Sequence, residues 1–152
     1  MQPNAGQIDR SKDADHFVWT KGMILGSHER GSGQYKIIGH LGDGTFGRAL
    51  ECLEINENRI YAVKVIRAVQ RYTESAKTEA SILRDLQRNG GCERGVVYLK
   101  EWFMHRSLDP RTRQKITNMC LVFEPLGKSL YDFIKDNKYK GFDIADVREI
   151  AR

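Results

Sequence analysis

Three successive segments in the first half of the chain alternate between apolar and polar residues with a period of two, which is typical of half-buried strands. They cover residues 35–43, 46–55 and 59–69. The turn-forming sequence at 56–58 separates the last two, and such short connections join antiparallel neighbours. The pattern therefore predicts a meander of hairpins.

Over residues 73–88 the period changes to 3.6, which indicates a helix, and the Asn-Gly-Gly sequence at 89–91 is typical of a helix end. Glu79 falls inside the apolar arc of this helix. An unpaired buried carboxylate is costly, so the position needs a cation nearby, unless the side chain lies at the edge of the arc and reaches water. The arc consists of Ala76, Ala80, Ile82, Leu83 and Leu86.

Two further strands are predicted at 96–104 and 118–123, with a basic loop between them. Helices are predicted to begin at Ser129 and Asp143, because each is followed three positions later by an acidic residue, as in a capping box. These elements predict an α+β fold: a five-stranded antiparallel sheet with one packed helix, then the first helices of a second unit.

The composition narrows the class of protein. The 152 residues suit one domain or a piece of one, and 40% of them are hydrophobic, which excludes wholesale disorder. The 25 Lys and Arg against 20 Asp and Glu give a net charge of +5 that is spread along the chain, so nucleic-acid binding is not expected. No apolar run is long enough for a membrane span, and residues 1–20 carry charges where a signal peptide is apolar, so the protein is expected inside the cell without a membrane partner.

No metal site is predicted. The three cysteines, Cys52, Cys92 and Cys120, lack the paired spacing of zinc or redox motifs and are interpreted as reduced thiols. Residues 1–34 are predicted to be a flexible lead-in with a short apolar segment before the sheet.

Residues 42–47 read Gly-Asp-Gly-Thr-Phe-Gly, a glycine spacing that occurs in nucleotide-binding loops. Asp43 followed by Gly44 is also a common hairpin turn, so the motif alone leaves both interpretations open. A dinucleotide-binding fold needs a helix after Gly47, whereas residues 48–55 have a strand pattern. The context favours a glycine-rich hairpin whose backbone amides approach phosphate, and it disfavours a Rossmann dehydrogenase.

One lysine, Lys64, interrupts the apolar run 61–66, and Ala62 shares its face of the strand. A small residue beside a lone cation suits the floor of a nucleotide site, where the ammonium group binds phosphate as a point charge. Taken alone, Lys64 fits an exposed sheet face at least as well. Glu79 on the following helix is the candidate partner that favours the functional interpretation.

Glycine hairpin, strand lysine, helix glutamate and two more strands, in this order, resemble the N-terminal lobe of a eukaryotic protein kinase. Within that family the chain is similar to the LAMMER or CDC-like dual-specificity kinases. The resemblance divides the chain into the lead-in 1–34, the N-lobe 35–123, and a hinge with a truncated start of the C-lobe at 124–152. It rests on the segments GDGTFGRALEC (42–52), YAVKVIRAVQRYTESAKTEASILRDL (61–86), EWF (101–103) and LVFEPLGKSLYDFIK (121–135).

The resemblance implies an ATP-binding site in which the glycine-rich loop covers the phosphates, Lys64 positions them and Glu79 holds Lys64. Phe123 takes the gatekeeper position, and the hinge at 124–126 binds adenine through its backbone. Ser129 and Asp132 either reach the ribose or only cap their helix. The implied ATP contacts are Leu41, Gly42, Asp43, Gly44, Thr45, Phe46, Gly47, Arg48, Ala49, Ala62, Lys64, Phe123, Glu124 and Leu126.

The chain departs from the family pattern in three places. Ala49 stands where valine is usual, and the loop 105–115 is longer and more basic than expected. The chain ends at Arg152 before the HRD, DFG and APE motifs, which in kinases supply the catalytic aspartate and the Mg²⁺ ligands. Residues 1–152 are therefore expected to clamp nucleotide and to transfer no phosphoryl group alone.

For the parent protein, the resemblance implies a kinase that moves the γ-phosphoryl group of ATP, with Mg²⁺, to serine, threonine or also tyrosine of protein substrates. Arginine/serine-rich splicing factors are the implied substrates, and the nucleus or the cytoplasm is the implied location. A pseudokinase, or another non-catalytic module that binds nucleotide or a partner, is the alternative.

Overall fold

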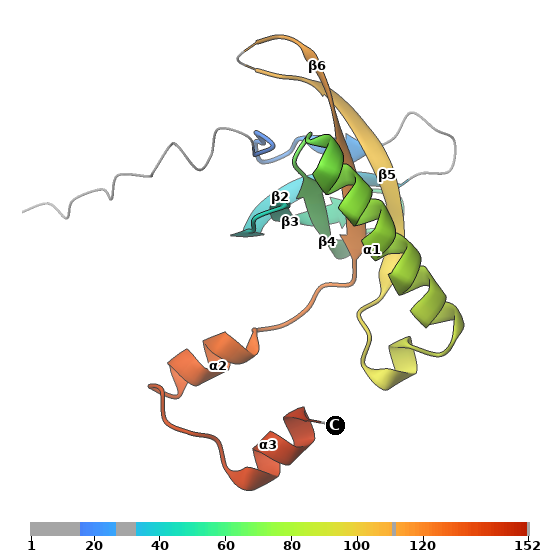
Figure 1. Cartoon of the computed structure of the whole chain (residues 1–152). Helices are drawn as coiled ribbons and strands as arrows, with labels where there is room; N and C mark the ends of the chain where they lie inside the picture. The colour runs from blue at the N-terminus through green and yellow to red at the C-terminus, as the bar shows by residue number, and fades with distance from the viewer. Residues whose placement is uncertain (1–15, 27–32, 111, 152) are drawn as a thin grey trace, which may run out of the picture.

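The computed structural model describes residues 16–26, 33–110 and 112–151. These residues form one antiparallel sheet in the order β1-β2-β3-β4-β6-β5, with a long helix against it and two short helices after it (Figure 1). The strands are β1 (Ile24–Gly26), β2 (Gln34–Asp43), β3 (Gly47–Glu54), β4 (Arg59–Ile66), β5 (Leu99–Leu108) and β6 (Lys115–Phe123). The helices are α1 (Gln70–Arg88), the 3₁₀ turn η1 (Cys92–Arg94), α2 (Leu130–Asp136) and α3 (Ile144–Ile150).

The α+β class and all five predicted strands are confirmed, and β1 adds a sixth strand that the sequence pattern did not predict. It pairs with β2, with Leu25 opposite Tyr35, and both side chains are fully buried. Three residues are too few for a period of two to be recognised, so the sequence analysis assigned this strand to the lead-in.

The extent of the basic loop between the last two strands was predicted wrongly. β5 continues to Leu108 and β6 begins at Lys115, so most of residues 105–115 belong to a hairpin that protrudes from the sheet (Figure 1). Its outer pairs include Arg106 with Thr117. Polar residues on both strands hide the alternation that would have marked them as strand.

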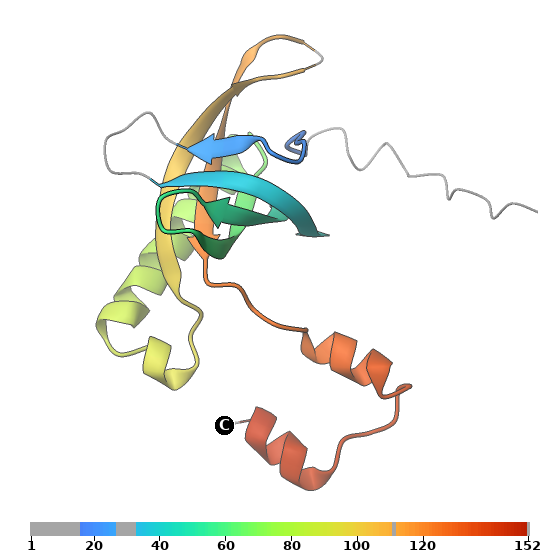
Figure 2. The same cartoon turned by 180° about the vertical axis from the view of Figure 1, so that it is seen from behind.

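Both faces of the sheet are covered by apolar residues. α1 lies in front of the sheet in Figure 1 and behind it in Figure 2, and packs on the face that carries Met119 and Leu121. The opposite face is built around Tyr35, Val63 and Phe103. β6 is therefore buried without interruption from residue 118 to residue 122.

α1 packs on the sheet through small side chains. Ala76 and Ala80 are 2% and 1% exposed, since a methyl group lets the helix backbone approach the strands. The predicted arc was too wide: Ile82 and Leu86 are exposed, because the sheet covers only the sector around the two alanines. The helix also begins at Gln70, three residues before the predicted start. Its N-cap residue is Val69, whose side chain makes no capping hydrogen bond, so the sequence carries no capping signal for this start.

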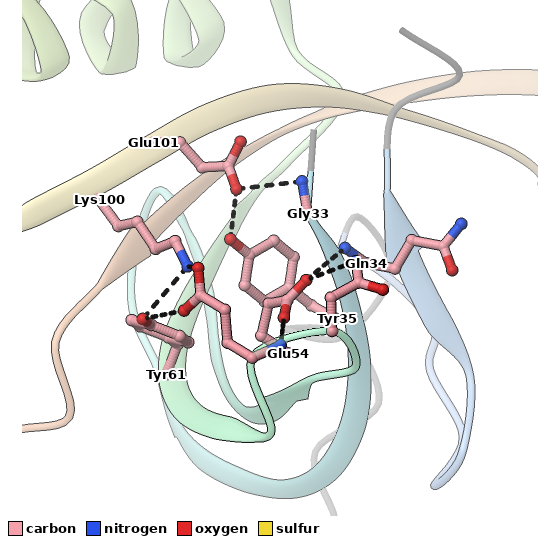
Figure 3. A network of polar contacts seen from close by, with 9 residues as sticks. Gly33, Gln34, Tyr35, Glu54, Tyr61, Lys100 and Glu101 are labelled. Carbon is pink, nitrogen blue, oxygen red and sulfur yellow. Dashed lines mark hydrogen bonds and ion pairs between the residues drawn. The ribbon is translucent and has the colours of Figure 1, made fainter. Parts of the chain in front are cut away.

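A polar network ties the start of β2 to β5 (Figure 3). Glu101 accepts hydrogen bonds from the backbone N–H of Gly33, at 3.2 Å, and from the phenol of Tyr35. Burial and the neighbouring Glu101 carboxylate raise the pKa of Tyr35, so the phenol remains a donor. On the next strand, the buried Glu54 accepts from the N–H of Gln34 at 3.3 Å.

The two outer strands of the sheet also meet. Nδ1 of His105 on β5 lies 3.4 Å from the nitrogen and 3.3 Å from the oxygen of Gly26 on β1. The strands at opposite ends of the sheet order are therefore in contact, so the sheet curls toward a closed shape.

After β6 the chain leaves the sheet, and α2 and α3 lie apart from it in both views (Figures 1 and 2). The predicted capping box at the start of α2 is confirmed, with Ser129 and Asp132 bonded reciprocally. The one at α3 is wrong: Asp143 is the N-cap residue, but its side chain makes no capping hydrogen bond. Among the described residues, no helix has the length and apolar character needed to cross a bilayer.

Candidate functional site

A cavity of about 900 Å³ lies between the β2–β3 turn, β4, α1 and the segment after β6. All the predicted site residues except Arg48 line it. Leu83, Val97 and Gly127 line it as well, and sequence reasoning did not select them. Leu83 lies one helical turn after Glu79 on the same face of α1, so helical periodicity could have identified it. Val97 lies in the loop between η1 and β5, where no periodicity applies.

The glycine-rich sequence forms the β2–β3 turn, which the N–H of Gly44 closes by donating to the carbonyl of Gly47 at 2.8 Å. Gly47 is required by the fold, because a Cβ there would lie 2.3 Å from the carbonyl oxygen of Val65 on β4. A Cβ on Gly42 would meet nothing within 4 Å. Within the protein, nothing crowds Gly42, so close packing of the chain does not explain the glycine there.

These two glycines make a matched pair for mutation. Gly47→Ala should lower the free energy of unfolding by about 3 kcal/mol, because β3 must move away from β4 to accept the methyl group. Gly42→Ala should change it by no more than about 0.5 kcal/mol. Urea unfolding of both variants checks this, and equal losses would show that the two positions are packed alike.

Asp43 and Arg48, on either side of the turn, form a bidentate ion pair with N···O distances of 2.7 Å and 3.2 Å. Arg48 also donates to the carbonyl oxygen of Phe17 at 3.1 Å, so its guanidinium joins the turn to the N-terminal segment and does not line the cavity. The guanidinium, with a smaller contribution from His40, lowers the pKa of Asp43 from 3.8 to about 2.

This ion pair should give a small acid dependence of stability. Because the folded-state pKa of Asp43 is depressed, its contribution is complete above pH 4 and is lost as the pH falls toward 2. The carboxylate is 41% exposed, so we expect at most about 0.5 kcal/mol. Asp43→Asn should remove this difference in urea unfolding at pH 5 and pH 3; an unchanged difference would show that other carboxylates cause it.

The predicted ion pair between the strand lysine and the helix glutamate is confirmed. Nζ of Lys64 lies 2.9 Å from both carboxylate oxygens of Glu79. The two side chains are 31% and 39% exposed, so the pair faces the cavity and is not sealed in the core. Glu79 therefore lies at the edge of the packed sector of α1 and has the cation that the position requires.

Small and apolar side chains surround Lys64 on the same face of the sheet. Ala49 on β3 is its partner in the register, and Ala62 lies two residues before it on β4, opposite Phe123 on β6. The alanines leave open space above the sheet. The floor of the cavity is therefore apolar and shallow, with one cation at its inner end.

The segment after β6 forms the outer wall. Glu124 is held against Tyr98, with its N–H 3.2 Å from the Tyr98 carbonyl and its carboxylate 2.7 Å from the Tyr98 N–H. Within the described residues, the N–H and carbonyl of Leu126 have no hydrogen-bond partner. This edge therefore offers free backbone groups to the cavity.

Ser129 and Asp132 lie at the mouth of the cavity, but they are engaged with each other. The Asp132 carboxylate accepts from both the hydroxyl and the N–H of Ser129, at 2.6 Å and 2.9 Å. These bonds lower the pKa of Asp132. The geometry establishes their capping role, and the ribose contact stays a prediction.

The described part of the chain has no group of three or more His, Cys, Asp or Glu side chains that could hold a metal ion. The site therefore combines a glycine turn, one ion-paired lysine, an apolar floor and a free backbone edge. That combination suits a ligand with a flat apolar part and a phosphate tail.

Comparison with known proteins defines the class. Residues 35–152 match the protein kinase domain family, and the chain belongs to that family. The crystal structure of the PF14_0431 kinase domain aligns with a TM-score of 0.71 and 41% identity, over 89% of this chain and 35% of that chain.

Two named relatives place the chain within the family. Serine/threonine-protein kinase AFC1 of Arabidopsis thaliana is 36% identical over 144 residues, which are 94% of this chain and 27% of that kinase. Dual specificity protein kinase CLK1 of Homo sapiens is 33% identical over 138 residues, covering 90% of this chain and 25% of that kinase. The resemblance to the LAMMER or CDC-like group is thus confirmed, and the chain spans about a quarter of the length of these relatives.

Proposed function

We propose that this chain is the nucleotide-clamping lobe of an ATP-dependent protein kinase. The observation that carries the proposal is the bidentate Lys64–Glu79 pair, which points an oriented ammonium group into a cavity roofed by the glycine turn. An ion pair holds the lysine in one position, and its charge then binds phosphate at a fixed place.

The cavity fits ATP part by part. The free backbone groups of Leu126 can pair with the edge of adenine, and the floor between Ala49 and Ala62 admits a flat ring. The open space at Gly42 lets phosphate approach the turn, and Lys64 compensates its charge. When bound, ATP supplies the γ-phosphoryl group that a kinase transfers.

Mg²⁺ needs oxygen ligands that the described residues do not gather. We propose that they come from a part of the protein beyond these residues, together with the group that accepts the substrate proton. That the 152 residues alone transfer no phosphoryl group stays a prediction.

The proposed acceptors are serine and threonine hydroxyls of proteins, and tyrosine if the enzyme has dual specificity. The resemblance to the LAMMER or CDC-like kinases supports arginine/serine-rich splicing factors as substrates and the nucleus or cytoplasm as the location. The competing function, a pseudokinase that binds nucleotide and transfers nothing, is separated from this one by measuring binding and transfer on the same protein.

Nucleotide binding tests the proposed site directly. Ala62→Leu should weaken ATP binding at least about 10-fold, because the added carbons occupy the space above the floor. Titration calorimetry on the purified protein measures it, with Ala145→Leu on the exposed face of α3 as the matched control. Equal affinities in the two variants would place the nucleotide elsewhere or nowhere.

A further inference from the structure

A second cavity, of about 320 Å³, shares no lining residue with the first. Three segments enclose it: the N-terminal segment before β1, the connection from β4 to α1, and the outer part of the β5–β6 hairpin. The sequence pattern did not predict the outer part of the hairpin, and the N-terminal segment lies outside the residues that match the kinase family.

Asn118 is the polar centre of this cavity. It is 2% exposed, lines the cavity, and donates from Nδ2 to the carbonyl of Ile66 at 2.8 Å. That bond fixes the orientation of the amide, because a flipped side chain would set two oxygens against each other. Its Oδ1 is buried and has no partner among the described residues.

Ser107, on the neighbouring strand, adds a second polar atom. Its Oγ is buried, lines the same cavity, and lacks a partner in the described part of the chain. A buried acceptor without a donor costs about 1–3 kcal/mol. Two such atoms at one cavity mark a place where a bound molecule gains hydrogen bonds.

Most of the other lining residues are apolar or aromatic, and the polar exceptions are His16, Thr20 and Asp109. Phe17 and Trp19 from the N-terminal segment face Met23, Val69 and Ile116. No lysine or arginine lines the cavity, and Asp109 does, so the wall is unsuited to phosphate or another anion. A volume of this size, with aromatic walls and few polar groups, is typical of small-molecule sites.

We propose that this cavity binds a small one- or two-ring aromatic molecule whose N–H or O–H donates to Oδ1 of Asn118. The apolar walls hold the rings and exclude water from the hydrogen bond, while the Ser107 hydroxyl serves a second polar group of the ligand. The site is separate from the proposed nucleotide site and does not depend on it.

Indole is the probe, because it has two rings and a single N–H donor. Benzothiophene has the same two-ring shape without a donor. Titration of the purified protein, followed by the NMR signals of the Ile116 methyl groups, should show indole binding at least about 10-fold more tightly than benzothiophene, the worth of one buried hydrogen bond.

Variants then locate the bound indole. Ala68→Phe, which adds a ring at the exposed rim, should weaken indole binding at least 10-fold, whereas Ala145→Phe on α3 should not change it. Ser107→Ala should leave the affinity for indole within two-fold of that of the unmodified protein, since indole has no second polar group. Equal binding of the two probes, insensitivity to Ala68→Phe, or no indole binding at its solubility limit would overturn the proposal and leave a water-filled cavity.

Discussion

Lys64→Met should lower kcat/KM for phosphoryl transfer from ATP by at least about 100-fold in the enzyme with a complete catalytic domain. Methionine keeps the apolar stem of the side chain and removes the charge that faces the cavity. The pair with Glu79 is partly exposed, so its loss should change the free energy of unfolding by about 1 kcal/mol or less. A large kinetic effect with a small stability effect is the signature of a group that acts on the transition state.

The measurement is phosphate transfer to an arginine/serine-rich peptide and to a peptide in which alanine replaces each arginine. Lys77→Met, on the exposed face of α1, is the matched control and should leave kcat/KM within about two-fold. Turnover of Lys64→Met at the level of the control would refute the role proposed for Lys64. Equal rates on the two peptides would refute the proposed substrate class alone.

Glu79→Gln should lower kcat/KM by about 10-fold or more, because Lys64 then loses the carboxylate that orients it at 2.9 Å. In the Lys64→Met background the same change should have almost no effect, because the residue that Glu79 positions is already gone. The pair should therefore be strongly non-additive in a double-mutant cycle.

Glu74→Gln, which removes a carboxylate from the exposed face of the same helix, controls for the change in net charge. It should leave kcat/KM nearly unchanged in both backgrounds. Additive losses from Lys64→Met and Glu79→Gln would mean that the ion pair does not act in catalysis, even though the two side chains meet.

Periodicity predicted the central hairpins and α1 because each element has one face that is more deeply buried than the other. The burial recurs with a period of two in the strands and of 3.6 in the helix. The Lys64–Glu79 pair was predictable for a different reason: a carboxylate inside an apolar arc needs a cation, and Lys64 interrupts the apolar run of the preceding strand. This argument rests on the cost of burying charge and holds whatever the family.

Other features depend on tertiary contacts that local pattern does not encode. β1 is too short to show a period, and the outer part of the β5–β6 hairpin carries polar residues on both strands. The pattern gave the direction in which α1 faces the sheet, but not the width of the covered sector, so Ile82 and Leu86 were misplaced. Val97 reaches the cavity through a loop after η1, which no periodicity describes.

The contact between the outer strands, β1 and β5, affects the tendency of the protein to aggregate. A sheet with free edges offers unpaired N–H and carbonyl groups to any extended chain, and this favours aggregation. Here β1 is only three residues long and its end lies against His105, while Glu101 on β5 is occupied by Gly33 and Tyr35. Where β5 runs on past this contact, it carries the exposed Arg106, whose charge discourages a further strand from docking. The curled sheet thus protects its own borders against intermolecular strand pairing.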